Sequence, residues 1–244
     1  GAGSIGSWQR LYFPAVDQKD TYRLVVATPT ALTDQPTRRW TPEADDEYLH
    51  GIVDQVISEF GRENIETFWL AGHSQGGMTS RRIVCSDYFR DKVDGFLSLS
   101  GGRVGTPPRA PVAGAAPAAL PVPLTCDFSH IFAIGELEAS SASATDTSEW
   151  ATRYGCGARV REDDVIDATR GYVTATDQSR GPSWGTTARP GTARVYKFEG
   201  CREGKVVVDV VRENKGHTEG LEPKITETIV RHMLSATGGK LQKG

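Results

Sequence analysis

The chain has neither an excess of one charge nor a long apolar run, and each absence argues against a class of function. Its 244 residues carry a formal net charge of −3, and the isoelectric point is about 6.0. This charge balance therefore gives no sign of a basic face that would bind nucleic acid or an anionic membrane surface. No apolar stretch has the length of a membrane span, and no signal-peptide pattern is visible at the start. With 38% hydrophobic residues, residues 1–244 are predicted to form one domain with a sizeable core.

Cysteine is scarce, and its spacing does not match a metal site. The four cysteines are an even number, which two disulfides in a secreted or periplasmic enzyme would explain. The favoured bridge joins Cys156 to Cys201, because it would staple a long insert to the last hairpin. Cys85 and Cys126 are the remaining two cysteines. The alternative is that all four cysteines are buried thiols in a cytosolic protein.

What the sequence does contain is a glycine-flanked serine directly after a short apolar stretch. Residues 67–71 predict a strand, and Gly72-His-Ser-Gln-Gly76 follows, with a helical pattern after it. This strand, turn and helix is the setting of a nucleophile elbow, in which Ser74 is the predicted nucleophile. Gly72 and Gly76 are expected to remove side chains that would collide in the turn, and the amide of Gln75 is expected to point at the oxyanion. The alternative is an ordinary glycine turn.

A serine nucleophile needs a base, and the chain offers only five histidines. His217 is the predicted base because it lies in the polar loop 214–220, between the valine-rich run 205–211 and a C-terminal helical pattern. The base of a Ser, acid, His order belongs after the last central strand. The competing interpretation is a solvated loop histidine. The remaining histidines are predicted to be structural, surface or packing residues: His50, His130, His232 and His73.

The carboxylate that orients the base is less clearly marked. Residues 128–134 predict a buried strand, but Gly135-Glu-Leu-Glu138 follows it and no aspartate stands at the expected place. Glu138 is the predicted third member, because it lies shortly after the strand and could accept the other ring N–H of the base. Glu136 and Asp146 remain alternatives.

The rest of the chain alternates strands and helices, which favours an α/β fold with a mostly parallel central sheet flanked by helices. Residues 104–123 predict a surface loop. Residues 139–194 predict a loop-rich insert that covers the site, with Trp150 and Trp184 more simply read as anchors than as stacking platforms for a ring of the substrate. The other predicted elements are strands at 22–28 and 95–100, helices at 41–60 and 223–234, and adjacent strands at 194–199 and 206–212.

With these residues in view, the chain resembles the α/β-hydrolase superfamily, and within it the feruloyl and acetylxylan esterases and the polyhydroxybutyrate depolymerase-like proteins. The elbow carries most of this resemblance. The looser matches are residues 24–29 with Trp40, Asp45-Asp46, Trp150-Ala151, Gly155-Cys156, 201–204 and Gly216-His217.

The resemblance implies that Ser74 is the nucleophile and His217 the base of a carboxylic ester hydrolase. It implies a small-molecule or polymer-linked ester as substrate, and neither a metal nor an organic cofactor. A glutamate at 138 departs from the aspartate that is usual in the family. Hydrolysis of a thioester, lactone or peptide bond, or a non-catalytic binding module on the same scaffold, are the rival functions.

A second departure from the family lies at the front of the chain. Residues 1–8 resemble the family's oxyanion loop, so the resemblance implies that the family's first strands are missing from this sequence. We expect a fragment of a longer protein rather than an expression scar, with the second oxyanion donor among the amides of residues 1–4. A sheet without those strands would expose an edge, which favours poor folding or dimerisation, and the oligomeric state is not predicted.

Overall fold

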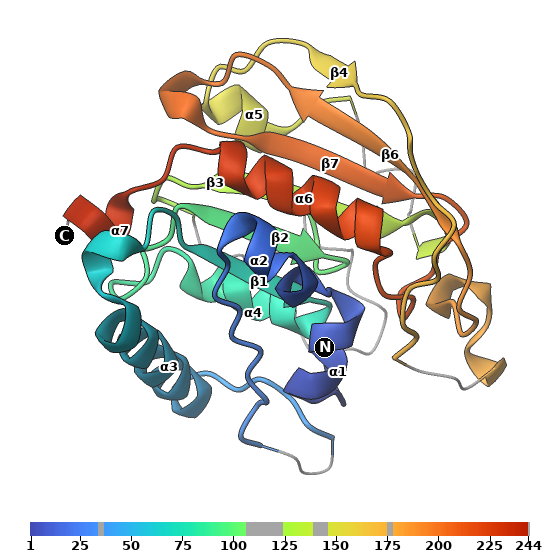
Figure 1. Ribbon diagram of the computed structural model, residues 1–244, viewed down its shortest axis with the longest axis horizontal. Helices are drawn as coiled ribbons and strands as arrows, with labels where there is room; N and C mark the ends of the chain where they lie inside the picture. The colour runs from blue at the N-terminus through green and yellow to red at the C-terminus, as the bar shows by residue number, and fades with distance from the viewer. Residues whose placement is uncertain (34–36, 106–123, 139–145, 175–177, 244) are drawn as a thin grey trace, which may run out of the picture.

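A seven-stranded mixed sheet organises the protein. The computed structural model describes residues 1–33, 37–105, 124–138, 146–174 and 178–243. Within them the strand order is β1-β2-β3-β7-β6-β4, and β5 also pairs with β6 (Figure 1). The strands are β1 (Trp69–His73), β2 (Gly95–Leu99), β3 (Ser129–Gly135), β4 (Arg159–Arg161), β5 (Val165–Asp167), β6 (Gly191–Phe198) and β7 (Val207–Arg212).

The sheet has a parallel centre and an antiparallel side. Strands β1, β2, β3 and β7 pair in parallel, whereas β6 is antiparallel to β7, and β4 and β5 are antiparallel to β6. The predicted α/β class is therefore confirmed, and the sheet is mixed. The antiparallel part arises because β6 and β7 are joined by a short connection, which suits a hairpin, while parallel strands need a long crossover.

Helices cover both faces of the sheet. The longer ones are α3 (Ala44–Phe60), α4 (Gln75–Ile83) and α6 (Pro223–Ser235), and Figure 1 shows α6 lying across the sheet. The shorter α-helices are α1 (Gly6–Tyr12), α2 (Lys19–Tyr22), α5 (Glu149–Arg153) and α7 (Lys240–Lys243), and the 3-10 helices are η1 (Ala15–Gln18), η2 (Arg62–Asn64), η3 (Glu136–Glu138), η4 (Gln178–Arg180), η5 (Pro182–Trp184) and η6 (Arg202–Gly204).

Residues of the central strands are buried in hydrophobic clusters on opposite faces of the sheet, of which two are large. Leu97 and Ile131 are buried in one hydrophobic cluster with Ile225 of α6. Phe96 of β2 and Phe128, which directly precedes β3, belong to a second cluster. This second cluster also contains Ile83 of α4, Trp150 of α5 and Phe89. A strand with apolar residues on both faces needs a helix on each side, which explains the continuous apolar runs of β2, β3 and β7.

The strand predicted at residues 22–28 is wrong. Tyr22 ends α2, Arg23 adopts the left-handed conformation, and residues 24–30 have no regular secondary structure. Val25 is 51% exposed. A strand needs a hydrogen-bonded neighbour, and among the described strands β1 at the sheet edge pairs only with β2. The apolar content of this segment is therefore not a sign of strand pairing.

The other predicted strands and helices of the main body are confirmed, but the insert is more ordered than its composition indicates. Of residues 139–194, the described part contains α5, β4, β5 and two 3-10 helices. Residues 139–145 and 175–177, and residues 106–123 of the predicted surface loop, lie outside the described residues. Two of the insert's segments thus extend the main sheet.

Both predicted disulfides are present. Cys156 after α5 is bonded to Cys201 after β6. Cys85 after α4 is bonded to Cys126 ahead of β3. The second bridge ties the elbow helix to the strand that leads to the predicted acid.

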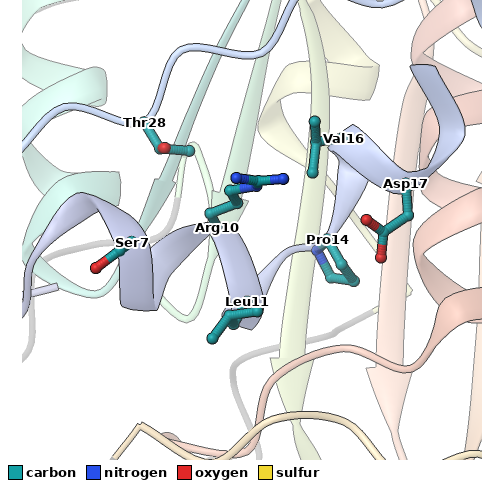
Figure 2. Close-up of a pocket in the computed structure, with 7 residues that line it drawn as sticks. All are labelled: Ser7, Arg10, Leu11, Pro14, Val16, Asp17 and Thr28. Atoms are coloured by element: carbon teal, nitrogen blue, oxygen red, sulfur yellow. The ribbon is translucent and has the colours of Figure 1, made fainter.

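Two further features of the described residues concern binding. None of the described helices combines the length and the apolar character needed to cross a membrane. A surface pocket of about 390 Å³ lies beside α1 and η1, and Figure 2 shows the residues that line it. They are Ser7, Arg10, Leu11, Pro14, Val16, Asp17 and Thr28, and none of them is a predicted catalytic residue.

Candidate active site

The four parallel strands each lead directly into a polar residue of the candidate site. Ser74 follows β1, Ser100 follows β2, Glu138 ends η3 directly after β3, and His217 lies in the loop after β7. The carboxyl ends of parallel strands lie at one edge of a sheet, where open α/β folds bind ligands. The topology therefore gathers residues that are far apart in the sequence.

The turn that carries Ser74 is strained. Ser74 has φ 55° and ψ −120°, a conformation that non-glycine residues rarely adopt and that is held at functional sites. Its N–H donates to the Leu99 carbonyl at 2.8 Å, which fastens the turn to β2. A Cβ on Gly72 would lie 2.2 Å from the Gly76 backbone. The turn therefore requires glycine at position 72, as predicted.

The prediction that Gly76 avoids a collision is wrong. A Cβ there would meet nothing closer than the Trp40 indole nitrogen at 3.9 Å. The crowded position is Gly77, where a Cβ would lie 2.8 Å from the Cα of Gly101 and 2.9 Å from the Gly72 carbonyl oxygen. The start of α4 packs against the loop after β2 at this point, and only a residue without a side chain allows that approach.

Ser74, His217 and Glu138 form a continuous hydrogen-bonded chain. Ser74 Oγ lies 2.8 Å from His217 Nε2, and His217 Nδ1 lies 2.6 Å from Glu138 Oε2. An ionised carboxylate only accepts hydrogen bonds, so the proton of the neutral imidazole is on Nδ1 and Nε2 is free to accept from the serine hydroxyl. The side chains of His217 and Glu138 are 21% and 12% exposed. The His217 imidazole is thus close to solvent but mostly enclosed.

Glu138 is held by donors on its other oxygen. Oε1 accepts from Ser100 Oγ at 2.6 Å and from the Gly135 amide at 2.8 Å. A carboxylate with both oxygens engaged cannot rotate without losing hydrogen bonds. The extra methylene of glutamate is accommodated because η3 brings residue 138 back toward the end of β3.

The two alternative carboxylates, Glu136 and Asp146, make no contact with His217. Glu136 pairs with Arg194 and accepts from the Asn214 amide at 3.0 Å, and this backbone hydrogen bond is the largest of the causes that lower its pKa. The side chain of Asp146 is 95% exposed and pairs with Arg159 at 3.0 Å. Of the three candidate carboxylates, only Glu138 contacts His217.

The loop around His217 is tied to the insert. The amides of His217 and Thr218 donate to the carbonyls of Ser183 and Trp184 at 2.9 and 2.7 Å. The Trp184 ring meets the His217 ring edge to face, with centroids 5.2 Å apart. Trp150, by contrast, is buried and donates its indole N–H to the Phe128 carbonyl at 2.9 Å. Trp150 is an anchor, whereas Trp184 lies beside His217.

Buried charged side chains form ion pairs and a hydrogen bond that hold the same loop. Lys215, Glu219 and Glu222 are all buried, and Lys215 Nζ lies 2.5 Å from Glu222 Oε1 and 3.7 Å from Glu219 Oε1. Glu219 Oε2 accepts from the Gly216 amide at 2.8 Å. Buried charges that are paired in this way fix local geometry, because breaking one pair leaves another charge uncompensated.

Three of the other four histidines make their contacts elsewhere in the fold. His50 stacks on Tyr88 with ring centroids 3.8 Å apart. His130 is buried in β3. His232 of α6 lies 3.1 Å from Glu162. These placements agree with their predicted structural roles.

The amide of Gln75, the first residue of α4, directly follows Ser74 and, among the described residues, donates to no backbone carbonyl. The Gln75 side chain instead makes two hydrogen bonds with the Trp40 backbone. Oε1 accepts from the Trp40 N–H at 3.1 Å, and Nε2 donates to the Trp40 C=O at 3.2 Å. In the predicted second donor segment, the amides of Gly3 and Ser4 already donate to carbonyls. The amide of Ala2 has no such bond among the described residues.

Sequence reasoning missed two supporting residues. The one signal that could have identified Ser100 is its position directly after the strand that neighbours the elbow strand. Tyr12, which donates to the His217 carbonyl at 3.3 Å, lies in a segment whose pattern gives no sign of the site.

The described residues contain no group of three or more His, Cys, Asp or Glu side chains arranged to hold a metal ion. Chemically, the arrangement can activate a hydroxyl by removing its proton and can later return that proton to a leaving group. Comparison with family models, with curated proteins and with solved structures finds no match to this chain.

Proposed function

We propose that the protein is a serine hydrolase that cleaves carboxylic esters through an acyl-enzyme. The observation that carries this proposal is the chain of hydrogen bonds from Ser74 Oγ through His217 to Glu138, with distances of 2.8 and 2.6 Å. A histidine that is hydrogen-bonded to a carboxylate and to a serine on a strained turn is the arrangement that activates the serine for attack on a carbonyl.

The proposed reaction has two steps. His217 Nε2 takes the proton of Ser74 as its Oγ attacks the ester carbonyl, and the imidazolium is stabilised by Glu138. The Gln75 amide, together with a second amide for which Ala2 is the candidate, donates to the oxyanion. His217 returns the proton to the leaving alcohol, and water then repeats the sequence on the acyl-enzyme.

We also propose that the fold is a form of the α/β-hydrolase fold. The support is the chain order Ser74, Glu138, His217, together with the nucleophile at a strand-to-helix turn and the base after the last parallel strand. Two disulfides favour a secreted or periplasmic protein, because such bonds persist in oxidising compartments.

The test is an assay of purified protein on p-nitrophenyl acetate, p-nitrophenyl butyrate and a feruloyl ester, with a thioester and a lactone alongside. We expect turnover of at least one carboxylic ester and its loss in Ser74→Ala. Preference for the thioester or the lactone would move the assignment to a related acyl hydrolase. Equal rates for wild type and Ser74→Ala on every compound would refute a hydrolytic role.

A further inference from the structure

A second histidine lies against the proposed base. The His73 ring is stacked on Tyr12, with centroids 3.8 Å apart and planes inclined by 19°. On another side it meets the His217 ring at 4.9 Å. Both Tyr12 and His73 are buried. His73 also immediately precedes Ser74 in the sequence, so it is covalently bonded to the main chain of the proposed nucleophile and contacts the proposed base.

The hydrogen bonds of His73 fix its tautomer. His73 Nε2 lies 2.9 Å from the carbonyl oxygen of His217. A carbonyl oxygen only accepts, so Nε2 carries a proton and donates it. His73 Nδ1 is buried and has no hydrogen-bond partner among the described residues, as suits a bare lone pair. Burial is the largest of the causes that hold the pKa of His73 well below its usual range. The ring is therefore neutral.

The acceptor of this bond is the main chain of the proposed base itself. The same carbonyl also receives the Tyr12 hydroxyl at 3.3 Å. We propose that His73, assisted by Tyr12, is a positioning residue that holds the His217 backbone at a fixed place relative to Ser74. This inference rests on the proposed function, because it assigns a role within the same reaction.

The physical reason is the short path between the two groups. His73 is covalently next to Ser74 and hydrogen-bonded to His217, so one rigid ring links the main chain of the nucleophile to that of the base. Displacement of a catalytic group by about 1 Å can lower a rate by about a hundredfold. A neutral donor also suits this place, since a cation 4.9 Å from the His217 ring would oppose the imidazolium formed in each step.

Two substitutions at one position separate the hydrogen bond from the packing. In His73→Gln, the side-chain amide can still donate to the His217 carbonyl. In His73→Phe, the ring and its stacking remain but the donor is lost. For the best substrate of the ester panel, we expect His73→Phe to lower kcat by at least about tenfold with KM changed by less than about twofold. His73→Gln should keep kcat within about threefold of the wild type.

Thermal denaturation verifies that both variants are folded. Equal kcat values for the two folded variants would overturn the inference. Tyr12→Phe keeps the ring that stacks on His73 and removes the hydroxyl that donates to the same carbonyl at 3.3 Å, so it serves if His73→Phe does not fold. In that case we expect kcat to fall by about two- to fivefold, and an unchanged kcat would count against the positioning role.

A spectroscopic measurement needs no functional assay. In protein labelled with ¹⁵N-histidine, we expect the His73 signals at pH 7 to show a neutral ring with its proton on Nε2. They are identified by their absence in His73→Gln. A proton on Nδ1 instead, or a charged ring, would refute the proposed hydrogen bond. A wild type inactive on every substrate, with the expected spectrum, would refute the proposed function and leave the hydrogen bond established.

Discussion

The substitution Glu138→Gln tests the acid assignment most sharply, because both oxygens of this carboxylate are engaged. Oε2 lies 2.6 Å from His217 Nδ1, and Oε1 accepts from Ser100 and from the Gly135 amide. An amide has one acceptor atom and one donor atom. If its NH₂ faces His217, the imidazole must move its proton to Nε2 and can no longer accept from Ser74.

The opposite orientation of the amide is also unfavourable. Its oxygen would then accept from His217, but its NH₂ would face the Gly135 N–H, which is 2.8 Å from Oε1 in the wild type. In either orientation the charge-assisted bond to the imidazolium, which contributes about 1.5–3 kcal/mol, is replaced by a weaker one. Since about 1.4 kcal/mol corresponds to a tenfold rate change, that loss alone predicts about a 10- to 100-fold drop in kcat.

Adding the wrong tautomer extends the expected drop to about 10⁴-fold, as for comparable triads. The assay is kcat on the best ester substrate, with urea denaturation to verify folding. Glu136→Gln is the matched control. Its side chain is 41% exposed and pairs with Arg194, so we expect kcat within about twofold. A kcat of the Glu138→Gln variant within about threefold of the wild type would refute the reasoning.

Three further predictions concern stability, each read from urea denaturation. Gly77→Ala should destabilise the protein by about 1–3 kcal/mol, while Gly76→Ala should be nearly neutral, because only at 77 does a Cβ meet backbone within 3 Å; equal effects would contradict the packing. Burial lowers the pKa of His130 to about 3, so below pH 6.5 the unfolded chain takes up a proton that the native state refuses. Stability should therefore fall by about 2 kcal/mol from pH 7 to pH 5, and His130→Gln should lose that part of the pH dependence. Replacing Cys85 and Cys126 by serine should cost about 4 kcal/mol, since the bridge closes a loop with a sequence separation of 41; an unchanged midpoint would show that the bridge constrains little.

Much of the α/β body could be predicted because its signals are local. The helix at residues 41–60 has a clear apolar period, and the buried strands at 95–100 and 128–134 are short continuous apolar runs. The elbow could be predicted for the same reason, because a strand, a glycine turn and a helix follow each other directly.

What could not be predicted depends on contacts distant in sequence. The apolar run at 22–28 has the composition of a strand, yet strand formation depends on a neighbour that composition does not reveal. The choice between Glu138 and Glu136 depended on the turn η3, which points one carboxylate at His217 and the other at Arg194. The support from Ser100 and Tyr12 is likewise a property of the assembled sheet edge.

The most direct test of the central claim is covalent labelling of the native protein by a fluorophosphonate, followed by mass spectrometry of the modified peptide. The account predicts rapid labelling on Ser74, no labelling in Ser74→Ala, and labelling slowed by at least about a hundredfold in His217→Gln. Labelling that is absent from the wild type, or that proceeds equally fast without His217, would contradict it.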